Sequence, residues 1–228
     1  MLHVKVFIFN PVQENSYILY NEQKQCCIID PGCYFENERQ ELRAFIEKLA
    51  LQPILLLNTH CHLDHVFGNK FVYDTWGLTL HIHEKEKQVL DFAPTSAEMW
   101  ELPFENYKAE LLFIKEGSDI KVGDDKLEIR FTPGHSPGHV VFYSEPGGFA
   151  ISGDVLFNGS IGRTDLPGGD FDVLLNSIQT QLFTLPDDTK IYSGHAAILA
   201  VTLETEDYSE KIFRHFIVRP DWLGGFLV

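Results

Sequence analysis

The sequence is poor in positive charge, and it contains no apolar run long enough to cross a membrane. Its 228 residues include 18 Lys and Arg against 33 Asp and Glu, which gives a formal net charge of −15. Such a surface repels nucleic acids and anionic membranes, so we expect neither as a partner. No apolar run approaches the roughly 20 residues of a membrane span. The composition therefore argues against a nuclease.

Cysteine is also scarce, with four residues: Cys26, Cys27, Cys33 and Cys61. None of them forms a C-x-x-C pair. The apolar start at 1–9 lacks the basic lead and the small-residue cleavage site of a signal peptide, and it is typical of a strand. We therefore expect a cytoplasmic protein whose thiols stay reduced.

The apolar pattern predicts an α/β fold. We predict strands at 2–9, 15–20, 25–30, 53–58, 78–83, 140–143, 149–152 and 190–193, a hairpin over 119–132, and helices at 36–50, 66–76, 84–92 and 171–185. Residues 93–118 are predicted to be irregular. Two runs of strands, each followed by helices, indicate four layers with two sheets inside and helices outside. No linker or repeat interrupts this order, so we expect a single domain over 1–228.

One short segment concentrates potential metal ligands. His60, His62, Asp64 and His65 fall within six consecutive positions, directly after the apolar strand predicted at 53–58. Imidazole and carboxylate groups bind divalent transition metals, above all zinc. Ligands at the end of a buried strand are held rigidly. The segment therefore predicts a metalloenzyme.

Three further residues have the same character, because each follows a glycine at the end of a predicted strand: His135, Asp154 and His195. Glycine allows the backbone to turn tightly there. A mononuclear zinc site needs three or four protein ligands. The chain offers seven candidates: His60, His62, Asp64, His65, His135, Asp154 and His195. Seven ligands fit two metal ions that share one carboxylate.

These motifs resemble those of metallo-β-lactamase-fold hydrolases. Within that superfamily the chain is similar to the small, single-domain glyoxalase II-like (hydroxyacylglutathione hydrolase-like) branch. The resemblance runs from about residue 3 to His195. It is carried by the H-C-H-L-D-H run at 60–65, the T-P-G-H-S-P-G-H run at 132–139, Gly153-Asp154 and Ser193-Gly194-His195. Secreted zinc β-lactamases often have cysteine where this chain has Asp154. The resemblance implies a four-layer αββα sandwich.

The resemblance also implies a role for each ligand. The first metal would be bound by His60, His62 and His135, the second by Asp64, His65 and His195, and Asp154 would bridge them. Two divalent ions are expected, zinc above all, with iron or manganese as alternatives. A hydroxide between the metals would attack the carbonyl of a small acyl thioester, with Asp64 and Asp154 as the catalytic carboxylates. A thioester suits such a site because a thiolate leaves without a strong general acid.

Two other functions remain open at this point. The related persulfide dioxygenases carry a similar Gly-Arg-Thr-Asp run, here at 162–165, and use one iron held by residues that match His60, His135 and Asp154. Two histidines and one carboxylate form the facial triad of iron oxygenases. A third hypothesis is that the protein is a member of the fold that binds metal but catalyses no reaction. The Leu-Pro-Gly-Gly run at 166–169 favours the hydrolase.

Other residues are expected around the ligands or in the substrate pocket. Asp30 either fixes the turn that follows its strand or hydrogen-bonds a metal ligand. Asn158 and Arg163 are pocket candidates, although an ion pair with Asp165 is favoured for Arg163.

Several histidines and one cysteine are expected to have structural roles. His139 is interpreted as a structural or ligand-supporting residue. We expect Cys61 to pack away from the two histidines beside it, and His81 and His83 to be polar surface residues.

The resemblance ends at His195. The 33 residues that remain (228 − 195) are too few for the helical domain that grips glutathione in full-length glyoxalase II. We therefore interpret 196–228 as a divergent C-terminal tail, which reflects either oligomer contacts or a coding-frame change near residue 196. The oligomeric state stays open.

Overall fold

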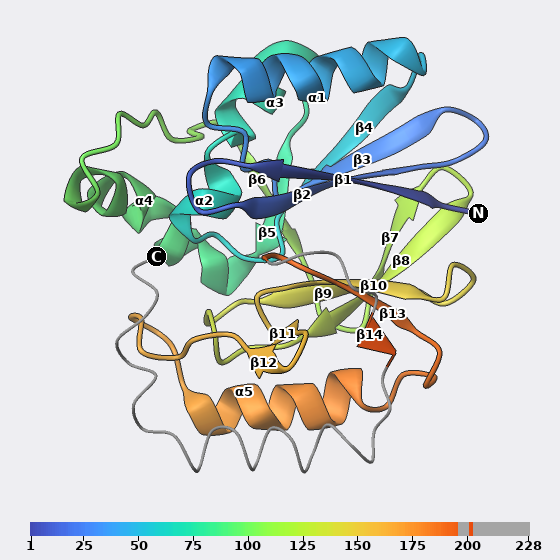
Figure 1. The fold of residues 1–228 in the computed structure, drawn as a ribbon, viewed down its shortest axis with the longest axis vertical. Helices are drawn as coiled ribbons and strands as arrows, with labels where there is room; N and C mark the ends of the chain where they lie inside the picture. The colour runs from blue at the N-terminus through green and yellow to red at the C-terminus, as the bar shows by residue number, and fades with distance from the viewer. Residues whose placement is uncertain (196–200, 203–228) are drawn as a thin grey trace.

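The computed structural model describes residues 1–195 and 201–202, and these residues form four layers (Figure 1). Two six-stranded sheets face each other, and helices cover the outer face of each sheet. The predicted αββα order is confirmed. Among the described residues, no helix is long and apolar enough to cross a membrane.

The first sheet takes its strands in chain order, from β1 to β6. The first three strands are antiparallel, and β3 to β6 run parallel, so the carboxyl ends of β3, β4 and β5 lie at one edge. The strands are β1 (His3–Phe9), β2 (Glu14–Tyr20), β3 (Gln25–Ile29), β4 (Gln52–Leu57), β5 (Leu80–His83) and β6 (Leu111–Ile114).

The second sheet has the order β14-β13-β10-β9-β8-β7, in which β10 and β13 run parallel. The predicted hairpin over 119–132 is present as β7 and β8. The strands are β7 (Asp119–Val122), β8 (Asp125–Phe131), β9 (Val140–Ser144), β10 (Phe149–Gly153), β13 (Lys190–Ser193) and β14 (Val201–Thr202). A small separate hairpin joins β11 (Leu156–Phe157) to β12 (Ser160–Ile161), and the sequence pattern missed it.

Three apolar clusters hold the layers together. The cluster between the two sheets contains Leu57 and Phe142. The cluster between the second sheet and α5 contains Leu174. The cluster between the first sheet and its helices contains Leu42 from α1 and Leu56 from β4. In Figure 1, α1 and α3 lie over the first sheet and α5 lies beneath the second. The helices are α1 (Glu36–Lys48), α2 (Leu63–Val66), α3 (Asn69–Trp76), α4 (Lys87–Met99) and α5 (Phe171–Ser177), with a 3-10 turn η1 (Glu84–Glu86) and a π-helical extension of α5, η2 (Ile178–Leu182).

The helix predicted at 66–76 is divided into α2 and α3. The division falls at Gly68, whose N–H donates to the Pro31 carbonyl at 2.6 Å. A Cβ on Gly68 would lie 2.4 Å from Cys33 Sγ, so only glycine allows this close approach. The predicted continuous helix is wrong here because the turn after β3 packs into the gap.

Helix α4 extends to Met99, beyond the predicted end at 92, although Pro94 lies inside it. Proline has no N–H for the carbonyl of the residue four positions earlier, which is Leu90. The Asn106 side chain donates to that carbonyl at 2.7 Å instead. The expectation of an irregular 93–118 segment is therefore wrong for the end of α4 and for β6, because a distant side chain replaces the missing hydrogen bond.

Replacing Leu56 by alanine should destabilise the fold strongly. Leu56 is fully buried between the first sheet and its helices, and truncation of such a side chain leaves a cavity that costs about 2–5 kcal/mol. Ile54, on the same strand, is 37% exposed, so Ile54→Ala should cost about 1 kcal/mol or less. Urea unfolding of both variants measures the two changes, and equal losses would contradict the assigned core.

Candidate metal centre

All seven predicted ligands lie at one edge of the two sheets. The 60–65 segment follows β4, His135 follows β8, and Asp154 and His195 follow β10 and β13. Two backbone hydrogen bonds tie these loops together, from Val140 N to Thr59 O at 2.9 Å and from Gly194 N to Gly153 O at 2.7 Å. The ends of strands from both sheets therefore converge on one site.

Three histidines form one potential metal-binding group, the first group: His60, His62 and His135. His135 Nε2 lies 2.9 Å from His62 Nδ1 and 3.3 Å from His60 Nε2. All three ligand nitrogens lie within 4.8 Å of one another. One cation could therefore contact all three rings.

A second potential group consists of Asp64, His65 and His195. Asp64 Oδ2 lies 2.9 Å from His195 Nε2 and 3.5 Å from His65 Nε2. These atoms also lie within 4.8 Å of one another. The H-C-H-L-D-H run thus divides between two groups that lie side by side, since the ring centroids of His60 and His65 are 4.1 Å apart.

Asp154 lies between the two groups. Its Oδ2 is 3.6 Å from His135 Nε2 in the first group and 3.5 Å from His195 Nε2 in the second. Its Oδ1 is 3.6 Å from His65 Nε2. A single carboxylate therefore faces ligands of both groups.

The two groups differ in protonation. Burial lowers the pKa of His60 well below its usual value, that of His62 to about 3, and that of His135 in the same direction. Burial acts on His65 and His195 in the same sense, but the facing Asp64 and Asp154 carboxylates outweigh it and raise both pKa values. The first group is therefore neutral, whereas the histidines of the second group hold protons more tightly than usual.

The two aspartates respond in the opposite direction. Burial alone would raise their pKa values, but the facing His65 and His195 rings lower the pKa of Asp64 to about 2 and that of Asp154 well below its usual value. Both side chains are therefore carboxylates, the form that binds a cation.

The donor set fits two divalent cations. Within the described ranges, His65 Nε2 and Asp154 Oδ1 are buried and have no hydrogen-bond partner. An unpaired buried polar atom is costly. A cation between these atoms would satisfy both, and five imidazoles with two carboxylates are the ligand types that zinc and iron accept. The His/Asp cluster therefore indicates a binuclear metal site.

Asp30 lies in the turn after β3 and next to one potential ligand, His65. Its backbone is left-handed, with φ of 47°, so it shapes the turn after β3. Its carboxylate accepts hydrogen bonds from Thr59 N at 2.7 Å and Asn58 Nδ2 at 3.1 Å. Asp30 Oδ2 also lies 3.2 Å from His65 Nδ1, the ring nitrogen that faces away from Asp64. Although Asp30 could join His60 and His65 as a third metal-binding group, this contact fits the orientation of His65 better.

Backbone carbonyls orient two further ligands. His135 Nδ1 lies 2.7 Å from the Arg163 carbonyl oxygen, and His195 Nδ1 lies 3.3 Å from that of Val12. The Arg163 side chain forms the favoured ion pair with Asp165, with Nε 2.7 Å from Oδ1. Arg163 therefore contributes its carbonyl oxygen near the centre, which its side-chain chemistry did not predict.

Glu86 is the supporting residue that sequence reasoning missed. Its carboxylate is fully buried and accepts from Cys61 N at 2.7 Å, Ser136 Oγ at 2.6 Å and Gly138 N at 2.6 Å. Burial raises its pKa, and these three donors oppose that change. Glu86 thus connects the 60–65 loop to the loop that carries His135. Its sequence context, Glu-Lys-Glu in a polar run, carried no signal of burial.

The predictions of structural roles around the centre have mixed outcomes. His139 Nε2 accepts from Asp154 N at 3.1 Å, and Cys61 is buried in the core, as expected. The surface expectation is wrong for His83, which is buried because its ring stacks on Phe131 at 4.6 Å. His81 is half-buried, and no potential metal-binding group of described residues includes it or His83.

The pocket role of Asn158 and the nature of the tail stay predictions. Asn158 is exposed in the turn between β11 and β12. Of the 196–228 tail, only β14 at 201–202 is described, so both explanations of the tail fall outside the described residues.

A family model described as the metallo-beta-lactamase superfamily matches residues 9–195. The chain belongs to this superfamily. The match spans all seven candidate ligands, and it makes the chain a metallohydrolase of the superfamily.

Relatives within the superfamily point to the glyoxalase II-like branch. The chain is 38% identical to the "Probable metallo-hydrolase YqgX" of Bacillus subtilis, over 86% of this chain and 91% of that protein. It is 35% identical to the "Hydroxyacylglutathione hydrolase GloC" of Haemophilus influenzae, over 89% and 95%.

Solved structures of the superfamily share this fold closely. The crystal structure of BLEG-1 B3 metallo-beta-lactamase has a TM-score of 0.82 and 35% identity, and covers 92% of this chain and 99% of that one. TTHA1623 in a di-iron-bound form has a TM-score of 0.78 and 33% identity, and covers 88% and 96%. The fold is therefore shared with a metallo-beta-lactamase and with a protein that binds two iron ions.

Acid should release metal from the second group before the first. Protons compete with metal for imidazole, and the raised pKa values of His65 and His195 make that competition begin at higher pH. Metal content measured after dialysis at decreasing pH should fall in two steps. His195→Gln should keep only the step at lower pH. A single step that releases both ions would contradict the assignment.

Replacing Glu86 by glutamine should weaken metal binding by the first group. An amide nitrogen would face one of the three donors that the carboxylate now accepts, and changes next to metal ligands typically cost about 10–100-fold in metal affinity. The control is Glu84→Gln, on the same turn but exposed. Competition with a chelator measures both variants, and equal metal affinity in wild type and Glu86→Gln would disprove the role of Glu86.

Proposed function

We propose that this chain is a dinuclear metallohydrolase of acyl thioesters, similar to glyoxalase II. The observation that carries the proposal is the position of Asp154 between two complete ligand groups. In this proposal His60, His62 and His135 hold one ion. Asp64, His65 and His195 hold the other, and Asp154 contacts both.

The bound ions would supply a hydroxide at neutral pH and would polarise the substrate carbonyl. The chain's own residues do the positioning. Asp154 lies between the two groups and Asp64 lies within the second, both as carboxylates, so they can orient a nucleophilic water and accept its hydrogen bond. Asp30 and the Arg163 carbonyl hold the His65 and His135 rings in place. Rigid ligands lower the cost of reaching the reactive geometry.

Two considerations support a thioester substrate. The relative named hydroxyacylglutathione hydrolase is similar along 95% of its length. A thiolate also leaves readily, so hydrolysis needs no strong general acid at the leaving group. We further propose that the substrate is a small acyl thioester of the hydroxyacylglutathione type and that the protein works in the cytoplasm.

The mononuclear persulfide dioxygenase is the second candidate, and it would use only His60, His135 and Asp154. The geometry favours the dinuclear hydrolase, because the second group is complete and its Asp64 lies 2.9 Å from His195 Nε2.

The proposal is tested by metal analysis together with an assay on lactoylglutathione. Protein purified without added metal should contain about two divalent ions per chain, as seven ligands require, and should release free thiol from the thioester. Oxygen uptake with glutathione persulfide, or β-lactam cleavage in place of thiol release, would overturn the assignment. Full metal loading with no turnover of any of these substrates would favour the hypothesis that the protein binds metal without catalysing a reaction.

Asp154→Ala should abolish most of the thioesterase activity while the fold survives. Loss of a residue that contacts both ions should exceed the roughly 10–100-fold effect of changes outside the ligand set. Circular dichroism checks the fold, and thiol release measures turnover. Asp187→Ala, at an exposed loop position, is the control. Near-wild-type turnover in Asp154→Ala would refute the mechanism.

A further inference from the structure

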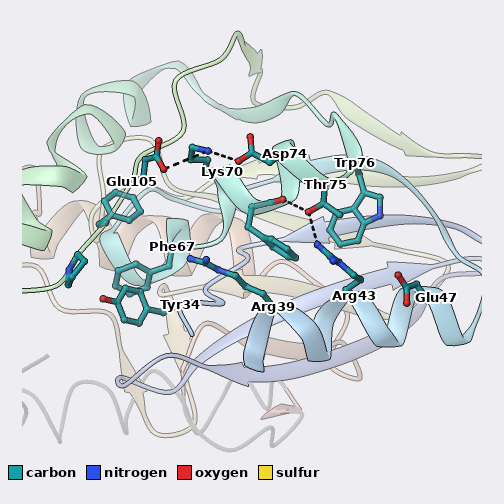
Figure 2. Close-up of a pocket in the computed structure, with 13 residues that line it drawn as sticks. Tyr34, Arg39, Arg43, Glu47, Phe67, Lys70, Asp74, Thr75, Trp76 and Glu105 are labelled. Atoms are coloured by element: carbon teal, nitrogen blue, oxygen red, sulfur yellow. Dashed lines mark hydrogen bonds and ion pairs between the residues drawn. The ribbon is translucent and has the colours of Figure 1, made fainter. Parts of the chain in front are cut away.

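A groove of about 800 Å³ lies on the helical face of the first sheet, between α1, α3 and the loop after α4 (Figure 2). None of the seven candidate metal ligands lines it. Its volume falls within the roughly 300–1,000 Å³ typical of small-molecule sites. The groove is therefore large enough to be a binding site in its own right.

Two arginines from α1, Arg39 and Arg43, line the groove one helical turn apart. The structure describes four arginines, and the other two, Arg130 and Arg163, each form an ion pair. Arg39 and Arg43 form none with the described residues, although the chain carries a net charge of −15. The two unpaired guanidinium groups are thus neighbours in one groove.

Three acidic residues and one lysine also line the groove: Glu47, Asp74, Glu105 and Lys70. Lys70, on the opposite wall, pairs with Asp74 at 2.5 Å and with Glu105 at 3.7 Å. Glu47 lies beyond Arg43, at the opposite end of the row from Arg39 (Figure 2). None of these acids forms an ion pair with Arg39 or Arg43.

The N–H donors of Arg39 and Arg43 form only long hydrogen bonds. Arg39 Nε reaches the Cys33 carbonyl at 3.5 Å, and Arg43 Nη2 reaches Thr75 Oγ1 at 3.4 Å, both at the long limit of a hydrogen bond. Both guanidinium groups lie over the Phe71 ring, at 5.9 and 5.4 Å from its centroid. Stacking holds the planar groups in place and leaves their N–H forks available for a carboxylate, phosphate or sulfonate.

Aromatic rings form the wall next to Arg39. The Tyr34 and Phe67 rings lie 4.7 Å apart, and the Phe104 ring lies 5.8 Å from that of Phe67. In Figure 2 the Tyr34 and Phe67 rings stand beside the Arg39 guanidinium. A ligand that places its charge on the arginines would therefore place an apolar body against these rings.

We propose that this groove binds a small organic anion, with its acidic group on Arg39 and Arg43 and a planar or apolar body against Tyr34, Phe67 and Phe104. The two arginines without an ion pair to the described residues favour an acidic group, the aromatic wall favours an apolar or planar body, and the volume fits a small molecule. The site is separate from the candidate metal centre and does not depend on the proposed function.

The test uses 2-naphthalenesulfonate, an aromatic monoanion that is a poor metal ligand, in calorimetric titrations of the metal-loaded protein at low salt. We expect saturable binding of one molecule per chain. The neutral analogue 2-naphthol should bind about tenfold more weakly or worse, because charge-assisted hydrogen bonds supply much of the affinity. No saturable binding of the sulfonate, or equal binding of the two compounds, would overturn the proposal.

Variants locate the site. Arg39→Gln/Arg43→Gln should bind the sulfonate at least about tenfold more weakly. The matched control, Lys48→Gln/Lys121→Gln, removes the same charge at exposed positions outside the groove and should bind like wild type. Metal content should be equal in all three proteins. Unchanged binding in the arginine variant, or equal loss in both variants, would disprove the site. If circular dichroism shows that the double variant is unfolded, Arg39→Gln alone is judged by the same criteria.

Discussion

Seven ionisable side chains packed at one edge of two sheets are the constraint on which the rest of the structure depends. Removing carboxylates and imidazoles from water is costly unless opposite charges or cations face them. Part of this cost is offset by pairing Asp64 and Asp154 with His65 and His195. In the first group burial outweighs the effect of these carboxylates, so its histidines are neutral instead. The two ligand groups thus offset the cost of burial differently, the second by pairing charges and the first by staying neutral.

The backbone around this centre is held by buried carboxylates on both sides. Asp30 binds the N–H of Thr59 from the β3 side, and Glu86 binds the N–H of Cys61 from the β5 side. His60 lies between these two anchors. Glu86 also binds the loop that carries His135, so one acidic residue fixes the distance between ligands that are far apart in sequence.

Close approach of backbone segments brings Asp154 next to the other ligands. A Cβ on Gly194 would lie 2.1 Å from Asp154 Oδ1, and a Cβ on Gly162 would lie 1.9 Å from the Asp154 carbonyl oxygen. Glycine is therefore needed at both positions for Asp154 to reach the space between the ligand groups. The short helix α2, which carries Asp64 and His65, continues directly into Phe67 on the wall of the groove.

The sequence by itself predicted most of the strands and helices, the αββα layers and the seven candidate ligands, because periodicity and ligand spacing are local properties. Only the tertiary structure decided those features that depend on contacts between residues far apart in the sequence. Pro94 stays inside α4 because Asn106 reaches its orphaned carbonyl group. Glu86 becomes an anchor because two loops close over it. Arg39 and Arg43 line the groove without an ion pair to the described residues, whereas Lys70 on the opposite wall pairs with Asp74 and Glu105. Position along the chain shows what a residue is, but only the fold shows which groups face it.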